Sequence, residues 1–168
     1  FLTATTLSEA LASILPCSSL DSLGSPYRER SVCRNLPNTE YPNRYDAFVQ
    51  GVYIEGHTDN DPVNPETGLA ADPRITSNLK LAARRSTNTF EILLSHRSEL
   101  LEFHGPVSTA EALRFEPVLA SSAYGEYRPA VPNDTDENKR ANRRIDIRVV
   151  MYQPINAAAL NQLFDYVR

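Results

Sequence analysis

Apolar residues along the chain recur with a helical period in some segments and with a period of two in others. Segment 6–15, "TLSEALASIL", has the helical period, which predicts an amphipathic helix. Thr6 or Ser8 can cap this helix, and Pro16 ends it. Segment 47–56, "AFVQGVYIEG", has β-branched and aromatic residues at its centre and predicts a strand.

A longer helix is predicted over residues 77–105, "SNLKLAARRSTNTFEILLSHRSELLEFHG". Ser77 suits the N-cap position, and Gly105 lies just past the predicted end. One apolar stripe follows the helical period; its members are Leu79, Ala83, Phe90, Leu94 and Leu101.

Three more elements are predicted in the second half of the chain. Residues 108–115 suit a short helix, and residues 117–139 suit a short strand followed by a Pro/Asn/Asp loop. Residues 143–152 alternate strictly, which predicts a strand; its dry face has Ile145, Ile147, Val149 and Met151, and its wet face has Arg144, Asp146 and Arg148. Residues 155–167 predict a closing helix. Strands alternating with helices indicate a two-layer α/β sandwich.

Composition narrows the class of protein. A chain of 168 residues with 41 % apolar and 23 % charged residues suits one globular domain. No apolar run reaches the ~20 residues that a membrane span needs, and no secretory leader is visible. The opening "FLTATTLSEA" suggests a domain cut from a longer polypeptide. The net charge of −4 argues against a general nucleic-acid-binding protein, which should be basic.

Cys17 and Cys33 are the two cysteines of the chain, and they lie in a segment rich in Ser, Pro, Gly and Asn. Such a pair predicts a disulfide and an oxidising compartment. In the chain-entropy model a bridge of this size stabilises the fold by roughly 3 kcal/mol. Two unrelated free thiols are the alternative.

The sequence gives little support for catalysis. His57, His96 and His104 are far apart and occupy no zinc-binding frame, and His57 with Asp59 alone is too small a ligand set. No nucleophile motif is present. We therefore expect no metal, no cofactor and no catalytic residue, although an enzyme is not excluded. The basic run 139–148, "KRANRRIDIR", favours a solvated strand face over a phosphate site.

Four motifs occur in a fixed order: "GHTDN", "SNLKLAARRS", "YGEYRP" and "NDTDENKRANRRIDIR". Together they resemble the OmpA-like peptidoglycan-binding domain, and the resemblance covers residues 48–152. It implies an α+β fold, a two-layer βαβαβ sandwich with a mixed sheet. The expected organisation is an N-terminal helix and cysteine-bearing excursion over 1–47, packed on an OmpA-like core over 48–168.

The resemblance also implies a binding site. It places the family's ligand residues, which hold the diaminopimelate of the peptide stem, at Asp59, Asn78, Arg85 and Arg143; Leu81 falls on the motif's leucine, and Thr58 is close to the site.

The side-chain chemistry agrees with such a ligand. Diaminopimelate presents a carboxylate beside an ammonium. The planar guanidinium of Arg85 suits a carboxylate, Asp59 suits the ammonium, and Asn78 offers neutral donors and acceptors near a helix N-terminus. Alternatively, Asp59 and Arg85 form a structural ion pair between loop and helix, and Arg143 is an ordinary strand-end arginine.

The chain departs from the family pattern at several positions. Its spacer between Asp59 and Arg85 is long and resembles that of flagellar stator B subunits. Because Arg84 lies beside Arg85, the family's ligand-binding arginine can also be assigned one position earlier. The other departures are Leu79, Ala82, Ser86 and Lys139.

The resemblance implies a non-catalytic wall anchor for a proton-driven membrane motor, with the B subunit of the Zorya anti-phage defence system as the nearest type. Its implied partners are the diaminopimelate-containing stem peptide, a second copy in a homodimer, and an A-type motor subunit reached through a membrane segment before Phe1. The resemblance further implies the periplasmic domain of an inner-membrane protein. The alternatives are a wall-binding module of an outer-membrane protein or lipoprotein, and a wall-peptide hydrolase.

Overall fold

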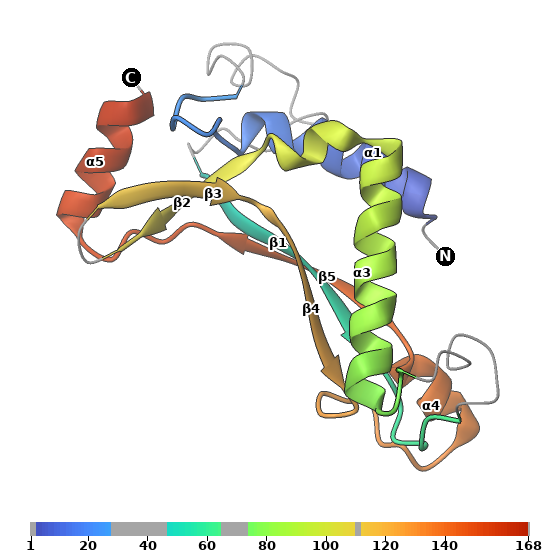
Figure 1. Cartoon of the computed structure of the whole chain (residues 1–168). Coiled ribbons are helices and arrows are strands. Elements are labelled where there is room, and N and C mark those ends of the chain that lie inside the picture. The colour runs from blue at the N-terminus through green and yellow to red at the C-terminus, as the bar shows by residue number, and fades with distance from the viewer. Residues whose placement is uncertain (1–2, 28–46, 65–73, 110–111, 168) are drawn as a thin grey trace. The chain divides into compact units, whose positions relative to one another are not determined.

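A computed structural model describes residues 3–27, 47–64, 74–109 and 112–167. Figure 1 shows the elements, which are α1 (Ala4–Ile14), η1 (Leu15–Cys17), β1 (Val49–His57), α3 (Asn78–His96), η3 (Ser98–Leu101), β2 (His104–Ser108), β3 (Leu113–Pro117), β4 (Leu119–Gly125), α4 (Asp136–Asn142), β5 (Ile145–Met151) and α5 (Ala157–Val167). The chain divides into two compact units, one of residues 1–52, 93–119 and 149–168, and one of residues 53–92 and 120–148.

The strands β4, β1 and β5 form a three-stranded sheet in the order β4-β1-β5. Backbone hydrogen bonds set the direction of β4. Val52 N–H donates to the Val118 carbonyl (2.6 Å), and Thr58 N–H donates to the Gly125 carbonyl (2.9 Å). The residue numbers increase on both strands from the first hydrogen bond to the second, so β4 and β1 are parallel. A helical crossover is the usual connection of such a pair, and α3 supplies it.

The other neighbour of β1 has the opposite direction. His57 N–H donates to the Arg144 carbonyl (3.0 Å), and Tyr152 N–H donates to the Phe48 carbonyl (2.8 Å). The residue number falls on β1 where it rises on β5, so these two strands are antiparallel. The sheet is therefore mixed, and the predicted α+β fold class is confirmed. The predicted division into 1–47 and 48–168 stays a prediction.

In the first unit, α1 agrees with the predicted N-terminal helix, but its predicted caps are wrong. Thr3 is the N-cap, because its extended backbone lets Oγ1 accept from the Thr6 N–H (3.2 Å). Pro16 lies in the following 3-10 turn, where its missing N–H costs no helical hydrogen bond. Cys17 lies in the same turn, whereas Cys33 is outside the described residues, so the disulfide stays a prediction.

The short helix predicted over residues 108–115 is wrong, because this stretch forms part of a hairpin. Strands β2 and β3 pair antiparallel from His104 opposite Pro117 to Ser108 opposite Leu113. Thr109 closes the turn, since its Oγ1 donates to the Ala112 carbonyl (2.7 Å). The hairpin thus forms around a polar turn between two short apolar runs, although the apolar residues here have the spacing of a helix.

Gly105, predicted to end the long helix, instead lies inside β2 against β1. A Cβ added there would lie 2.3 Å from the Val49 carbonyl oxygen, so this backbone contact requires glycine.

The hydrophobic core of the first unit gathers side chains from its strands and from α5, which agrees with the predicted closing helix. Its members are Leu20, Phe48, Leu113 and Leu163, with Phe115, Tyr152 and Phe164 packed against them. None of the described helices is long and apolar enough to span a bilayer.

In the second unit, α3 begins as predicted. The Lys80 N–H donates to Ser77 Oγ (3.3 Å), which satisfies one free donor of the first turn. The predicted apolar stripe is wrong by one position: Leu79 is 46 % exposed and Ala83 is exposed, whereas Ala82 and Ser86 are buried. Helix α3 packs on β1 where Gly56 meets Ala82; a Cβ on Gly56 would lie 2.2 Å from the Ala82 carbonyl oxygen.

The predicted dry face of β5 is also partly wrong, since Val149 and Met151 are 50 % and 41 % exposed. Alternation identifies the two faces of a strand but not whether a second layer covers either of them. Helix α4 was predicted as loop. Thr135 caps it by accepting from the Asn138 N–H (3.2 Å), and Asp136 and Glu137 lie in its first turn, where negative charge is favourable.

Candidate ligand-binding site

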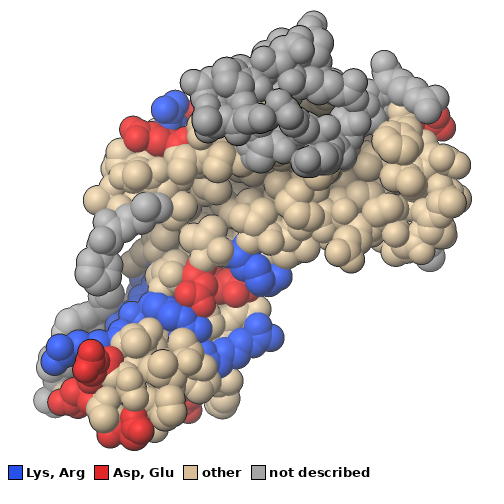
Figure 2. Space-filling model, turned by 180° about the vertical axis from the view of Figure 1, so that it is seen from behind, with Lys and Arg blue, Asp and Glu red and all other residues tan. Residues whose placement is uncertain are grey.

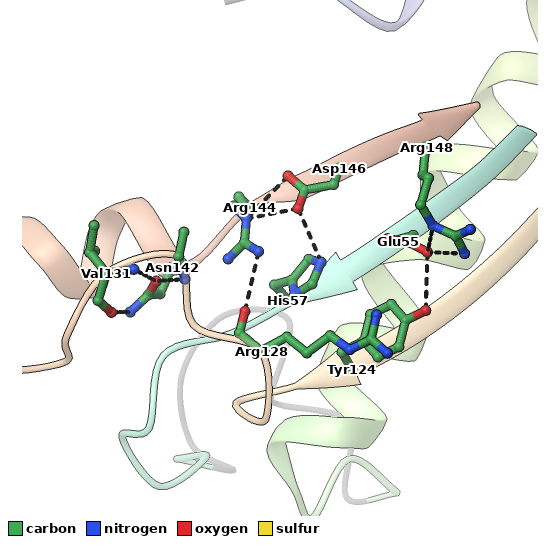
Figure 3. Close-up of polar contacts among 10 residues, drawn as sticks. Glu55, His57, Tyr124, Arg128, Val131, Asn142, Arg144, Asp146 and Arg148 are labelled. Atoms are coloured by element: carbon green, nitrogen blue, oxygen red, sulfur yellow. Dashed lines mark hydrogen bonds and ion pairs between the residues drawn. The ribbon is translucent and has the colours of Figure 1, made fainter. Parts of the chain in front are cut away.

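Polar side chains cross the sheet on one face of the second unit, from β4 over β1 to β5 (Figure 3). Glu55 is only 5 % exposed. Arg148 donates to it through Nε (2.8 Å) and Tyr124 through its hydroxyl (3.1 Å). Burial alone would raise the pKa of Glu55, but these two hydrogen bonds hold the pKa below its ordinary value. The carboxylate is thus an ionised structural group.

His57, next along β1, is 2 % exposed. Its ring stacks on Tyr124 with centroids 5.4 Å apart, and Nε2 lies 3.3 Å from Asp146 Oδ2. Burial lowers the pKa of His57, and Arg144 lowers it further, against the opposite effects of Asp146 and Glu55. The imidazole is therefore neutral and structural.

This depressed pKa predicts a pH dependence of stability. Because the unfolded state binds the His57 proton more readily, the free energy of unfolding should fall as the pH drops below about 6.5, by at most about 1.4 kcal/mol per pH unit. In His57→Gln this slope should disappear from urea titrations between pH 7.5 and 5.5. The exposed His96→Gln control should keep the wild-type slope, and an unchanged slope in His57→Gln would contradict the assignment.

The loop after β1 carries two acidic side chains that bind α4 and its C-terminal flank. Asp59, 6 % exposed, forms an ion pair through Oδ2 with Arg143 Nη1 and accepts from the Asp61 N–H (3.3 Å). Asp61 accepts from Lys139 Nζ (2.6 Å). The Lys139 pair is open to solvent and contributes little to stability, whereas in the other pair Asp59 is buried and Arg143 is exposed.

Asn142 positions Arg143. Its fully buried side chain accepts from the backbone N–H groups of Ala130 (2.8 Å) and Val131 (3.2 Å). It also donates to the Val131 carbonyl and to Asn133 Oδ1, both at 2.8 Å. These four bonds join the end of α4 to the preceding loop (Figure 3).

Arg85 lies on α3 and lines a pocket of about 370 Å³. The pocket-lining residues are Arg85, Asn88, Thr89, Arg143, Arg144 and Ile145. Arg85 is half-buried, and its guanidinium has no hydrogen bond or ion pair with any described residue. Burial lowers the pKa of Arg85, the Asp59 carboxylate raises it, and Arg143 lowers it. A desolvated cation without a partner is suited to bind an anion.

The structure brings Arg85 and Arg143 together, with Asp59 behind Arg143. The other predicted site residues do not line the pocket. Asn78 donates to Glu126 Oε2 (2.5 Å) and to the Asp61 carbonyl (2.9 Å), so it holds the loop. Thr58 is buried, and Leu81 is half-buried in the first turns of α3.

Sequence reasoning missed Asn88, Thr89 and Ile145 as pocket residues. The two α3 residues lie three and four positions after Arg85, so helical periodicity offered a signal for them. Ile145 lies two positions after Arg143 and is the first residue of β5.

The described residues contain no group of three or more His, Cys, Asp or Glu side chains able to hold a metal ion. Figure 2 shows Lys and Arg interspersed with Asp and Glu on the visible face. Mixed charge of this kind does not make the single-sign field that nucleic-acid binding uses.

No family model matches the chain. Motility protein B of Bacillus subtilis is 27 % identical over 113 residues, which cover 67 % of this chain and 34 % of that protein. Over this stretch the chain resembles motility protein B. It spans about a third of the length of this relative, and the resemblance to the stator B-subunit type of OmpA-like domain is confirmed. The narrower resemblance to the Zorya B subunit stays a prediction.

Two solved structures illustrate what this chain is similar to. The C-terminal domain of Helicobacter pylori MotB is 23 % identical, with 74 % of this chain and 70 % of that chain covered and a TM-score of 0.42. The cell wall anchor of the type VI secretion system (T6SS) of Pseudomonas aeruginosa is 21 % identical, with 62 % and 56 % covered and a TM-score of 0.42. Superpositions this loose carry no argument about function.

Proposed function

We propose that this domain binds the diaminopimelate of the peptidoglycan stem peptide without catalysing a reaction on it. The observation that carries the proposal is the half-buried guanidinium of Arg85, which has no partner among the described residues and lines a pocket beside the Asp59–Arg143 ion pair. A ligand carboxylate would supply a negative partner charge for the Arg85 guanidinium, in the bidentate geometry that arginine favours.

The ammonium of the same amino-acid head would be attracted by Asp59. That carboxylate already accepts from Arg143 and from the Asp61 N–H, but an ionised carboxylate has about four acceptor positions. Asp59 thus has two proposed roles: it orients Arg143 and it compensates the ammonium. This arrangement selects a zwitterion over a simple anion.

Binding of this kind would anchor a larger complex to the cell wall. Similarity to motility protein B supports a motor-like complex, with the domain in the periplasm and an inner-membrane segment elsewhere in the full protein. We further propose that the protein is a homodimer, that an A-type membrane subunit is its partner, and that it acts in anti-phage defence. The motif resemblance supports these three features. A wall-binding module of an outer-membrane protein or lipoprotein is the second candidate, and it would use the same pocket.

Co-sedimentation with purified sacculi tests the proposal. The wild type should pellet, and Asp59→Asn should stay largely in the supernatant, because the neutral amide neither compensates an ammonium nor fixes Arg143 as an ion pair. Asp21→Asn, a change at a distant carboxylate, should pellet like wild type. A wild type that stays soluble would contradict wall binding, and release of stem peptides from the sacculi would show a hydrolase instead.

A further inference from the structure

The pocket continues past the charged head group along α3. Asn88 and Thr89 line it one helical turn after Arg85. Residues three positions apart on a helix are separated by about 4.5 Å along its axis. The pocket therefore has a charged end at Arg85 and Arg143 and a neutral polar end at Asn88.

The neutral end contains an amide with unused hydrogen-bonding capacity. Asn88 is half-buried, and within the described part of the chain its side chain has no hydrogen-bond partner. Thr89 differs, because its hydroxyl donates to the Arg85 carbonyl (3.0 Å). A partly desolvated carboxamide offers one acceptor and two donors, which match the N–H and C=O of a peptide group.

The middle of the pocket has an apolar contribution. Ile145, half-buried at the start of β5, lines the pocket together with Arg143 and Asn88. A short methylene chain is the part of a ligand that an isoleucine wall accommodates. Four carbon–carbon bonds of about 1.5 Å span roughly 5 Å when extended, similar to the separation of Arg85 and Asn88 along the helix.

The size of the pocket agrees with such a ligand. A volume of about 370 Å³ lies at the lower end of the roughly 300–1,000 Å³ of small-molecule pockets. It accommodates one diamino acid residue with an attached peptide group.

We infer that Asn88 is a specificity-determining residue that binds the peptide group on the far side of the diamino acid, so that the pocket recognises a peptide-linked residue rather than an isolated amino-acid head. The inference rests on the proposed function. The head would lie between Arg85 and Arg143, the methylene stem against Ile145, and the peptide group at Asn88.

The test compares two ligands by NMR titration. The first is the stem tetrapeptide, whose diaminopimelate lies between peptide bonds; the second is D-norleucine, which has the amino-acid head and an alkyl stem but no peptide group. Asn88→Ala should weaken tetrapeptide binding about 5- to 20-fold, the loss of one or two hydrogen bonds, and should change norleucine binding less than about twofold. The exposed neighbour Thr87→Ala is the matched control and should change neither.

Equal weakening for both ligands, or no weakening for the tetrapeptide, would overturn the role of Asn88. In the wild type, the Asn88 side-chain NH₂ resonances should shift with the tetrapeptide and not with norleucine, which tests the contact even if the variant unfolds. If the wild type binds neither ligand, the proposed function falls as well. If Arg85→Ala abolishes binding of both ligands and Asn88→Ala changes binding of neither, only the role of Asn88 is overturned.

Discussion

Replacing Arg85 by alanine should abolish binding to the stem peptide while leaving the fold intact. A charge-assisted hydrogen bond to a carboxylate contributes about 1.5–3 kcal/mol, so the affinity should fall more than tenfold. Stability should hold or rise slightly, because the half-buried guanidinium has no partner among the described residues and burial lowers its pKa. Calorimetric titration with the stem peptide and a melting curve measure the two effects.

Arg84→Ala is the matched control for this prediction. The two arginines are adjacent in sequence, but Arg84 is exposed and only Arg85 lines the pocket. The control should bind like wild type. A loss of several kcal/mol of stability in Arg85→Ala, with peptide binding retained, would show that this arginine is a structural partner of Asp59.

The second large effect is expected at Asn142. Asn142→Ala would leave the N–H groups of Ala130 and Val131, the Val131 carbonyl and Asn133 Oδ1 without this partner. Each of these four hydrogen bonds contributes about 0.5–1.5 kcal/mol, so the free energy of unfolding should fall by about 3 kcal/mol. Chemical denaturation measures this loss, and peptide binding should weaken too, because Asn142 precedes Arg143.

Asn138→Ala provides the comparison on the same helix. The Asn138 side chain donates once, to Asp134 Oδ1 at 2.6 Å near the surface, so its loss should cost less than about 1 kcal/mol. Equal effects of the two substitutions would contradict the view that the buried network around Asn142 holds the loop before α4.

The sequence predicts the fold and the site to different extents. The positions of α3 and β5 followed from periodicity, and that of β1 followed from its β-branched and aromatic residues. The hairpin of β2 and β3 did not, since its strands are five residues each and their helical spacing was coincidental. The one-position error in the buried stripe of α3 arose because Ala82 and Ser86, small or polar, face the sheet and the larger Leu79 does not.

Three of the predicted ligand residues lie close together in the structure, and their role in ligand binding stays a prediction. Asp59, Arg85 and Arg143 came from the motif resemblance, and the structure brings them together. What the motifs did not convey is that Asp59 pairs with Arg143 rather than with Arg85. Arg85 thus remains available for a ligand. Pairing between residues far apart in sequence depends on tertiary geometry, which local pattern does not encode.

The most direct test is a titration of the wild type with two stem peptides that differ in one group. One contains diaminopimelate, and the other contains lysine, which lacks the side-chain carboxylate. Binding of the diaminopimelate peptide at least tenfold tighter, with this preference lost in Arg85→Ala, is the predicted result. Equal affinity for both peptides would contradict the account, because the guanidinium would then hold no carboxylate.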